Sequence, residues 1–476
     1  MAIANQNYTG PFDAEVDVVV VGAGGAGLSS AIAAADNGAD TLLLEKRPSP
    51  YDCTTALSSG AVSFAGTDLQ KKRGIKDSND ALYKDIMETG RWKNEPKLVQ
   101  AYVDNQLETF NWLTKLGIKW GSIEGLAGMS NPRAHLVYPV HLIETLTRAA
   151  KEKGVKILYK ASMIGLLTED NSKVIGVKVS EASGTVFIRA RKGVVLTCGG
   201  FARDKERLAK LDPRYVKMCT FAGGMGCTGD GHRMAKELGA YERDIEYVKP
   251  SFAAHVSASS VSETSLLYYY GAIVVNKRGE RFMNESISYR DMGLISLDQP
   301  DGVGYQVFDQ RIFDAAVMKT KEQEGIISPE VVVEGLDKAR ISLLDSGDTV
   351  EELADRIHVS VGALKRTVER YNGFVDSGKD LDFGRKTLVG NIGKPMRIDK
   401  PKFYAFATMN HWTSTYGGIA IDENMRVLRT GGTIPGLYAA GEIVGGFHGA
   451  SYHTGTSVGK ALVFGRVAGR NVALGH

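Results

Sequence analysis

The sequence predicts an α/β fold in which a parallel sheet is interrupted by a second domain. Three observations predict it. A buried strand near the N-terminus runs into a glycine-rich turn, similar strand–glycine elements recur far along the chain, and the middle segment has a different character. Because 476 residues are too many for one simple core, we expect two domains, one inserted in the other.

Composition excludes several classes of protein. With 43% hydrophobic and 24% charged residues, the chain has the composition of an ordinary globular protein. A formal net charge of +3 without any long Lys/Arg run gives no support to nucleic-acid binding. The sequence has no run of about 18 apolar residues, so it predicts no membrane span. The N-terminus lacks the basic and apolar regions of a signal peptide, so we expect a cytoplasmic protein.

The cysteines are few and scattered. None of the four lies in a CxxC or CxxCH pattern, which argues against a disulfide framework, a zinc site and c-type haem, and we expect no metal site. They are Cys53, Cys198, Cys219 and Cys227. The 55 glycines, by contrast, far exceed the usual share of roughly 7%. Many of them should lie where the backbone turns tightly or approaches a ligand.

The first element is a strand, a turn and a helix near the N-terminus. Residues 17–21 form a nearly all-apolar run that predicts a buried parallel strand. The run enters 22–27, GAGGAG, which fits GxGxxG and precedes a helical segment, 28–37, and a second strand, 40–44. In this pattern the first glycine permits the turn, the second admits a pyrophosphate, and the third lets helix pack on strand.

This arrangement predicts a Rossmann-like dinucleotide site. The phosphate would lie at the helix N-terminus, and Glu45, at the end of the second strand, is placed to hydrogen-bond ribose hydroxyls. A glutamate rather than a basic residue here favours an unphosphorylated ribose, as in FAD or NAD. The expected contacts are Gly22, Gly24, Gly25, Ala26, Gly27, Glu45 and Lys46.

Further strand–glycine elements lie far from the first. Residues 193–200 are again a strand followed by glycines, preceded by strand-like segments at 155–159 and 174–179. Residues 226–231 open a helical stretch, and 436–442 form a strand that ends in Gly-Glu. A second strand–glycine–acid element near the C-terminus indicates that both ends of the chain close on one long cofactor. This favours FAD over NAD.

Five ordered motifs carry a family resemblance. They are TTALSSG (54–60), TGDG (228–231), GERFMNE (279–285), TYGGIAID (415–422) and IPGLYAAGE (434–442). In this order they resemble the flavoprotein family of fumarate reductase and succinate dehydrogenase, a group that includes the 3-ketosteroid dehydrogenases. The resemblance covers 16–471. It implies a Rossmann-like FAD-binding domain at 1–239 and 397–476, with an α+β cap, the substrate domain, inserted at 240–396.

The resemblance also implies a set of FAD contacts. Residues of the TTALSSG and TGDG segments would lie along the cofactor, Glu442 would bind ribityl hydroxyls, and the helix after Gly455 would face the flavin N1/O2 edge. Since a reduced flavin is anionic there, the helix N-terminus would stabilise it. Attachment is expected to be non-covalent, although Cys53 lies near the covalent position of succinate dehydrogenases. The residues added by the resemblance are Thr54, Thr55, Leu57, Ser58, Gly60, Ala161, Thr197, Gly199, Gly200, Asp230, Gly441, Glu442, Gly455, Thr456, Ser457 and Val458.

The middle segment should form the cap. It holds the aromatic run 266–270, a strand-like stretch at 272–276, and helical stretches at 349–357 and 359–371. If the aromatic run were a strand, alternation would send Tyr268 and Tyr270 to one face.

The resemblance implies hydride transfer between flavin N5 and the β-carbon of an activated carbon–carbon unit, coupled to proton transfer at the α-carbon. The activating carbonyl must be polarised, and the proton needs an acid or a base. Arg281, in the retained GERFMNE motif, is the expected proton donor. Its alternative role is an ion pair that only ties the cap to the FAD-binding domain.

Three carboxylate-binding elements of the dicarboxylate reductases are missing. Tyr452 stands where those enzymes place an arginine, in 448–455, HGASYHTG. Thr413 and Ser414 occupy the place of a histidine, and 264–265, Thr-Ser, that of a Thr-Glu pair. A bidentate arginine clamp for a carboxylate is thus absent, which argues against fumarate or succinate as substrate.

Phenols replace the missing charge. Tyr452, Tyr416, Tyr268 and Tyr270 are the candidate catalytic tyrosines, because a buried phenol donates to a ketone oxygen and, with a lowered pKa, acts as a base. Ketosteroid dehydrogenases place a tyrosine before a glycine whose N–H also binds the carbonyl. Tyr452 and Gly455 are similar to that arrangement, with one residue fewer between them. Gly455, His411 and His453 are the expected substrate contacts, whereas His448 is expected to be structural.

Three functions remain open. The preferred one is an FAD-dependent oxidoreductase acting on CH–CH groups next to a ketone, such as a 3-ketosteroid or another cyclic enone. The alternative is a reductase of a monocarboxylate enoate, urocanate- or cinnamate-like, with Arg281 as proton donor. A redox-inactive FAD-binding subunit is disfavoured by the intact glycine motif. Without haem or iron–sulfur motifs, the expected partners are a small apolar or aromatic carbonyl substrate and a diffusible electron carrier, quinone or separate redox subunit.

Overall fold

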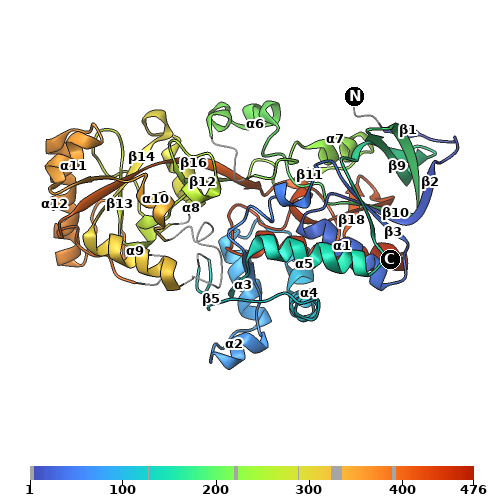
Figure 1. The fold of residues 1–476 in the computed structure, drawn as a ribbon, viewed down its shortest axis with the longest axis horizontal. Coiled ribbons are helices and arrows are strands. Elements are labelled where there is room, and N and C mark those ends of the chain that lie inside the picture. Colours follow the sequence, from blue (N-terminus) through green and yellow to red (C-terminus); the bar gives the residue numbers. More distant parts are fainter. Residues whose placement is uncertain (1–4, 127, 219–222, 288, 323–334, 389–392) are drawn as a thin grey trace. The chain divides into compact units, whose positions relative to one another are not determined.

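The computed structural model describes residues 5–126, 128–218, 223–287, 289–322, 335–388 and 393–476 (Figure 1). The chain divides into two compact units. The nucleotide unit consists of Met1–Pro213, Gly223–Val248 and Ser414–His476, and the cap unit consists mainly of Lys249–Thr413, with a short stretch that begins at Arg214. The sequence places the cap at 240–396, whereas the chain leaves the cap unit only after Thr413, because the long strand β16 (Phe403–Thr415) pairs within the cap sheet.

A largely parallel sheet forms the centre of the nucleotide unit. Its main path runs β1-β8-β9-β10-β2-β3-β7, and β19 extends it from β10 and pairs with β18. The central pairs β10–β2, β2–β3 and β3–β7 are parallel, while β8–β9 and β9–β10 are antiparallel. The strands are β1 (Gln6–Asn7), β2 (Ala14–Val21), β3 (Thr41–Glu45), β7 (Lys156–Tyr159), β8 (Ser162–Glu169), β9 (Lys173–Glu181), β10 (Gly184–Leu196), β18 (Arg426–Arg429) and β19 (Gly432–Ala439).

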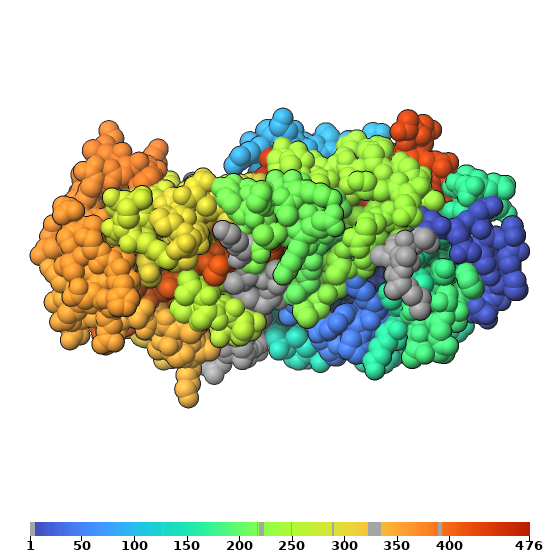
Figure 2. Space-filling model, turned by 90° about the horizontal axis from the view of Figure 1, so that it is seen from above, coloured from blue at the N-terminus to red at the C-terminus, as the bar shows by residue number. Residues whose placement is uncertain are grey.

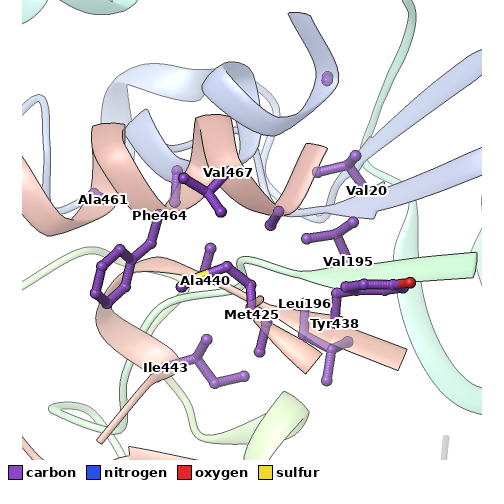
Figure 3. Packing of buried hydrophobic residues seen from close by; sticks show 14 of the residues in the cluster. Val20, Val195, Leu196, Met425, Tyr438, Ala440, Ile443, Ala461, Phe464 and Val467 are labelled. Atoms are coloured by element: carbon purple, nitrogen blue, oxygen red, sulfur yellow. The ribbon is translucent and has the colours of Figure 1, made fainter. Parts of the chain in front are cut away.

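Both ends of the chain meet in the core of this unit. Helix α1 (Gly25–Asp36) follows β2 directly and packs on the C-terminal helix α13 (Thr456–Leu474). The packing is close, since side chains at Gly465 and Gly469 would overlap the backbone of Ala26 and Ser30. Figure 3 shows Val467 and Phe464 of α13 in the same cluster of buried side chains as Val20 and Val195 of the sheet. The last helix is therefore part of the same core as the first strand, which confirms the predicted α/β fold.

The sequence-predicted strands of this unit appear with small shifts. The run at 17–21 lies within β2, the stretch at 155–159 within β7 and its preceding residue, and 174–179 within β9. The helix expected after 226–231 begins at Asp230 as α7 (Asp230–Glu237). The remaining helices and strands of the unit are α2 (Asp68–Lys72), α3 (Asn79–Thr89), α4 (Pro96–Lys115), α5 (Pro139–Glu152), α6 (Lys205–Leu211), β4 (Ala61–Ser63), β5 (Ile123–Glu124), β6 (Ala134–Leu136), β11 (Glu242–Arg243) and β17 (Gly418–Ile419).

The cap unit has its own sheet and its own core. The strand order is β12-β16-β14-β13, and β15 also pairs with β16. Apolar side chains of this sheet and its helices form a cluster separate from that of the nucleotide unit. Helices α11 and α12, which match the expected helical stretches, lie on the surface of the unit (orange in Figure 2). The elements are β12 (Val248–His255), β13 (Ile273–Val275), β14 (Gly304–Asp309), β15 (Asp345–Gly347), α8 (Tyr289–Ser296), α9 (Gln310–Glu322), α10 (Lys338–Ile341), α11 (Val350–Arg356) and α12 (Val361–Ser377).

The aromatic run of the cap is not a strand. Leu267–Tyr270 forms a short 3₁₀ helix, and Gly271, with φ of 126°, ends it. The strand interpretation of this run is therefore wrong, because a positive φ immediately after the tyrosines turns the chain back. Tyr268 and Tyr270 consequently do not share a face by strand alternation.

Two features are absent from the described ranges. No helix in them is long and apolar enough to cross a membrane. Among the same residues, no group of three or more His, Cys, Asp or Glu side chains is arranged to hold a metal ion.

Candidate active site

The GxGxxG turn forms a tight connection between β2 and α1. Gly22 has φ of 107°, and a side chain there would lie 2.6 Å from the carbonyl oxygen of Thr197. A side chain at Gly27 would overlap the carbonyl oxygen of Gly22. Thr197, whose hydroxyl donates to the carbonyl oxygens of Val21 (2.8 Å) and Gly22 (3.1 Å), holds the turn from the neighbouring strand. Gly22 and Gly27 therefore serve the backbone of the turn.

Gly24 has a different environment, which fits a pyrophosphate. A side chain at Gly24 would meet only Cys53, with its Cβ at 3.7 Å. Gly24 is also the N-cap of α1, and no side chain caps the helix. Gly25 donates its N–H to the hydroxyl of Thr55 at 3.2 Å. Open space beside an uncapped helix N-terminus is what a dinucleotide phosphate requires.

The expected adenosine end contains two charged groupings. Glu45, which is buried, accepts hydrogen bonds of 2.8 Å from the backbone of Ala23 and of Arg47. Its own carbonyl accepts from the N–H of Ala161 at 3.0 Å. Lys46 lies 2.7 Å from Asp230, so two residues that are 184 positions apart form an ion pair. Glu45 holds the glycine turn, and the ion pair links β3 to the start of α7.

Glu442 joins three motifs that are distant in sequence. Its carboxylate accepts from the hydroxyl of Thr54 at 3.0 Å and from the backbone N–H of Thr415 at 3.0 Å. A side chain at Gly200 would lie 2.6 Å from the same carboxylate. Burial raises the pKa of Glu442 above its ordinary value, although the bonds from Thr415 and Thr54 oppose this. The tertiary structure thus brings the TTALSSG, TYGGIAID and AAGE segments to one point.

Other expected cofactor residues shape the backbone around this point. The hydroxyl of Ser58 donates to the carbonyl of Thr55 at 2.7 Å, and Leu57 donates its N–H to the carbonyl of Cys53 at 3.2 Å, which closes a turn. Three glycines have positive φ, and side chains there would strike neighbouring segments: Gly60 at Val137, Gly199 at Cys227 and Gly441 at Ala26.

The N-terminus of α13 is also uncapped. Gly455, the N-cap, has φ of 85° and no side chain caps the helix. The carbonyl of Gly455 accepts from the N–H of Ser63 at 3.1 Å, and the hydroxyl of Thr456 donates to the carbonyl of His453 at 2.6 Å. Ser457 and Val458 continue the first turn. These two hydrogen bonds fix the backbone before and at the start of α13. The N–H groups and the positive dipole end of the helix are therefore available to an anionic group.

An aromatic cluster lies beside this helix end. The rings of Tyr416 and Tyr452 are stacked at 5.9 Å, and His448 lies 5.1 Å from Tyr416 and 5.7 Å from Tyr452. Phe447 packs edge-on against His448 at 4.9 Å. All four side chains are buried. We call Tyr416, Phe447, His448 and Tyr452 the aromatic wall.

Tyr452 is hydrogen-bonded to the helix end itself. Its Oη accepts the backbone N–H of Gly455 at 2.9 Å. Burial raises the pKa of Tyr452 above its ordinary value, against smaller opposing effects of Gly455 and Ser457. The lowered pKa that a base role would need is not found, because loss of water outweighs the hydrogen bonds. At neutral pH Tyr452 is a neutral phenol that donates rather than a base.

His453 points to the interior. It is 1% exposed, and its Nδ1 lies 3.1 Å from the carbonyl oxygen of Thr454. Burial, together with the nearby Arg133 guanidinium, lowers the pKa of His453 to about 3. The ring is thus shielded from solvent, and its expected contact with substrate stays a prediction.

The neighbour of His453 is a buried ion cluster that sequence reasoning missed. Arg133 contacts Asp77 at 2.9 Å and Asp85 at 2.9 Å, and all three side chains are buried. Asp85 also accepts from the backbone and hydroxyl of Ser130 at 2.7 and 2.8 Å. These residues come from separate loops and α3, with no motif to mark them. Only the tertiary structure brings the charges together.

Arg281 lies in a buried ion network inside the cap unit, and among the described residues its Nη1 has no hydrogen-bond partner. Its guanidinium makes a bidentate pair with Glu285 (2.9 and 2.7 Å) and contacts Asp380 at 3.0 Å. The rings of Tyr371 and Phe383 lie 5.0 and 5.2 Å from it. Burial alone would lower the pKa of Arg281, yet the two carboxylates raise it above the ordinary value. Both carboxylates belong to the cap unit, so these pairs do not tie the cap to the nucleotide unit, and the proton-donor role of Arg281 stays a prediction.

The other cap candidates are distributed over its core. Tyr268 is fully buried and donates from Oη to the carbonyl of Phe252 at 2.8 Å. Tyr270 is half-buried at the edge of the same apolar cluster. His411 lies on β16 and is buried. Arg290, a residue that the sequence analysis did not single out, is buried in the first turn of α8 and contacts Asp291 at 3.0 Å.

Three cysteines of the nucleotide unit, Cys53, Cys198 and Cys227, lie near the expected cofactor residues. Burial raises the pKa of Cys53 and of Cys198 to about 11 each, and raises that of Cys227 as well. All three are free thiols. Cys219 lies outside the described residues. A protonated, buried thiol is a poor nucleophile, which agrees with the expectation of non-covalent FAD.

The comparisons with known proteins agree with this geometry. A family model described as an FAD binding domain matches residues 17–458, most of the chain. A probable fumarate reductase, Ifc3, of Shewanella frigidimarina is 32% identical over 96% of this chain and 74% of its own. A urocanate reductase of Eggerthella lenta is 30% identical over 96% of this chain and 75% of its own.

A solved structure shows the same fold over the full length of both chains. The 3-ketosteroid-Δ4-(5α)-dehydrogenase of Rhodococcus jostii, in complex with 4-androstene-3,17-dione, is 26% identical, with a TM-score of 0.76 over 99% of this chain and 100% of its own. Relatives of this kind act on C=C or CH–CH groups. The protein therefore belongs to the FAD-binding flavoprotein family of the fumarate reductases and is an FAD-dependent oxidoreductase of that family.

Proposed function

We propose that this enzyme transfers hydride between FAD and the β-carbon of a carbon–carbon unit next to a ketone, in a 3-ketosteroid or another cyclic enone. The observation that carries the proposal is the hydrogen bond from Gly455 to Tyr452 at the N-terminus of α13. A phenol oxygen that accepts an N–H polarises its own O–H. Tyr452 is thereby a donor for a ketone oxygen, where negative charge develops during hydride transfer.

The aromatic wall supports a neutral substrate. Tyr452 occupies the position where the dicarboxylate reductases place an arginine, and it stacks on Tyr416 instead of carrying a charge. A carboxylate placed against buried phenols would lose its water without gaining a cation, which is costly. A ketone has no charge to lose, and its apolar frame suits buried rings.

The chemistry divides between cofactor and chain. FAD supplies a hydride acceptor and donor; Gly24, the α1 N-terminus and Glu442 would hold it. In the oxidative direction the substrate loses hydride from the β-carbon and a proton from the α-carbon, and the C=C bond forms. The neutral Tyr452 binds the carbonyl oxygen as the enolate develops. In the reductive direction the same hydrogen bond from Tyr452 stabilises the enolate until the α-carbon is protonated.

A monocarboxylate enoate remains the second candidate, supported by the identity with a urocanate reductase. For this reaction Arg281 is the less suitable proton donor, since two buried carboxylates hold it. Arg290, which is buried in the first turn of α8 and contacts Asp291, is a further cap arginine to test for this role.

A substrate panel tests the proposal. The FAD-loaded protein is photoreduced without oxygen, and re-oxidation by steroid enones, urocanate, cinnamate and fumarate is followed in the flavin absorbance. We expect re-oxidation by a cyclic enone and none by fumarate. Re-oxidation by urocanate or cinnamate but by no enone would overturn the ketone assignment in favour of the second candidate.

A further inference from the structure

Lys460 is a buried cation without a carboxylate partner. It lies on α13 with 1% of its surface exposed. Its Nζ donates to the carbonyl oxygen of Val444 at 2.8 Å and lies 5.9 Å from the centre of the Phe447 ring. Among the described residues, no carboxylate comes within ion-pair distance of it. Lysine is almost never fully buried unless paired, so this position needs a physical reason.

The position of Lys460 follows from its neighbours on α13. It lies one turn after Thr456, the first residue of the helix. A side chain at Gly25, at the start of the pyrophosphate turn, would lie 3.6 Å from Leu462, two residues further on. Ala461, shown on α13 in Figure 3, faces Gly441 in the same way. Along α13, Lys460 thus lies between the uncapped first residue of the helix and the residues that pack on the pyrophosphate turn.

Two opposing effects act on the protonation of Lys460. Burial lowers the pKa of Lys460 to about 8, while Glu442 and Asp244 act in the opposite direction from a distance. The same Glu442 links Thr54 and Thr415 in the cofactor site. A buried charge acts over a longer distance than an exposed one, because little water screens it.

We propose that Lys460 is a positioning residue that stabilises the reduced, negatively charged flavin relative to the oxidised one. Its charge adds to the positive end of the α13 dipole. A cation behind the flavin makes the cofactor a better hydride acceptor. It therefore favours the oxidative direction, in which the substrate loses hydride to the flavin and a proton to a base. The proposal rests on the flavin ring lying at the α13 end and is independent of the substrate's identity.

The test compares three variants of the FAD-loaded protein. Lys460→Met removes the charge and retains the length of the side chain, whereas Lys460→Arg retains the charge. Lys192→Met is the matched control, because exposed Lys192 likewise donates to a carbonyl of α13, that of Ala473, at the other end of the helix. The ratio of reduced to oxidised flavin is measured without oxygen against a redox dye. Thermal unfolding and FAD affinity are recorded in parallel.

We expect the ratio to fall at least about fivefold in Lys460→Met and to stay within about twofold of wild type in Lys460→Arg and Lys192→Met. A lower melting temperature with an unchanged ratio in Lys460→Met would mean that Lys460 only supports the fold, and it would overturn the proposal. If Lys460→Met does not fold, Lys460→Gln, which can still donate to Val444, replaces it. An unchanged ratio in that variant overturns the proposal equally.

Discussion

The backbone N–H of Gly455 donates a 2.9 Å hydrogen bond to the phenol oxygen of Tyr452, immediately before the last helix begins. Three residues of sequence thus connect a catalytic candidate to a helix N-terminus. The bond fixes the phenol against the end of α13, and burial keeps it protonated. The role of Tyr452 in the proposed reaction follows from this pairing: it donates a hydrogen bond to the substrate and does not abstract its proton.

Tyr452→Phe should reduce turnover of an enone substrate. The ring and its stacking on Tyr416 remain, while the donor to the carbonyl oxygen is lost. We expect kcat to fall at least about tenfold, or roughly 1.4 kcal/mol of transition-state stabilisation. Tyr438→Phe is the control, since its phenol also donates a single hydrogen bond, 2.8 Å to the carbonyl of His476, away from the site. Equal kcat and KM in wild type and Tyr452→Phe would remove this residue from the mechanism.

Gly24→Ala and Gly27→Ala should separate cofactor binding from folding. A methyl group at Gly24 meets only Cys53 at van der Waals distance, so the protein without FAD should keep its stability. The methyl group occupies the space of the pyrophosphate, and FAD affinity measured by flavin fluorescence should fall. At Gly27 the methyl group overlaps the carbonyl of Gly22, so this variant should lose stability even without FAD. If Gly24→Ala bound FAD with the affinity of wild type, the pyrophosphate could not lie beside Gly24.

Arg281→Met should destabilise the protein strongly. It leaves the carboxylates of Glu285 and Asp380 buried without their partner. Removal of one partner of a buried ion pair costs about 3–5 kcal/mol. Arg278→Met is the matched control, because Arg278 pairs with Glu280 at the surface, where such pairs contribute about 0–1 kcal/mol. Urea denaturation measures both.

The same position also tests the proton-donor role. Arg281→Lys keeps a positive charge near both carboxylates, and we expect its kcat to remain within a few-fold of wild type below the unfolding transition. A folded Arg281→Lys variant that lost turnover by about a hundredfold would instead assign proton transfer to Arg281.

Acid should destabilise the protein through its buried histidines. Burial lowers the pKa of His453 to about 3 and that of His135 to about 4, from an ordinary value of 6.5. Between the ordinary pKa of 6.5 and the lowered values in the folded protein, these histidines bind protons in the unfolded chain but not in the folded one. The free energy of unfolding therefore falls as pH falls through this range. The stabilising contribution is complete above about pH 6.5. His453→Gln should show a shallower decline between pH 7 and pH 4, measured by denaturant unfolding, and an unchanged decline would exclude His453 as a source.

Local motifs explain most of what sequence reasoning predicted correctly. The strand, glycine turn and helix at 17–37 are recognisable because each step depends on residues a few positions apart. The ordered motifs predicted FAD as the cofactor and identified the family. The aromatic run of the cap was considered only as a possible strand, and the 3₁₀ helix that it forms before Gly271, with its positive φ, is not revealed by apolar patterning.

The partners of charged side chains were harder to predict from the sequence than the positions of the glycine turns. Arg281 stood out in a motif, yet its partner Asp380 is 99 residues away. Lys460 looked like one polar residue in a helix, and the Arg133 cluster carried no pattern at all. The direction of the pKa shift of Tyr452 was also beyond sequence reasoning, since it depends on how much water the surrounding segments exclude.

The sequence by itself determined the α/β class, the dinucleotide turn, the cofactor and the replacement of an arginine by Tyr452. These depend on short-range geometry: a strand that must turn, a phosphate that must approach the backbone, a helix that must begin. The tertiary structure alone decided which charges are paired, which phenol is buried and which amide it meets. Burial and pairing are set by segments hundreds of residues apart, as where Glu442 meets Thr54, and no local pattern encodes that meeting.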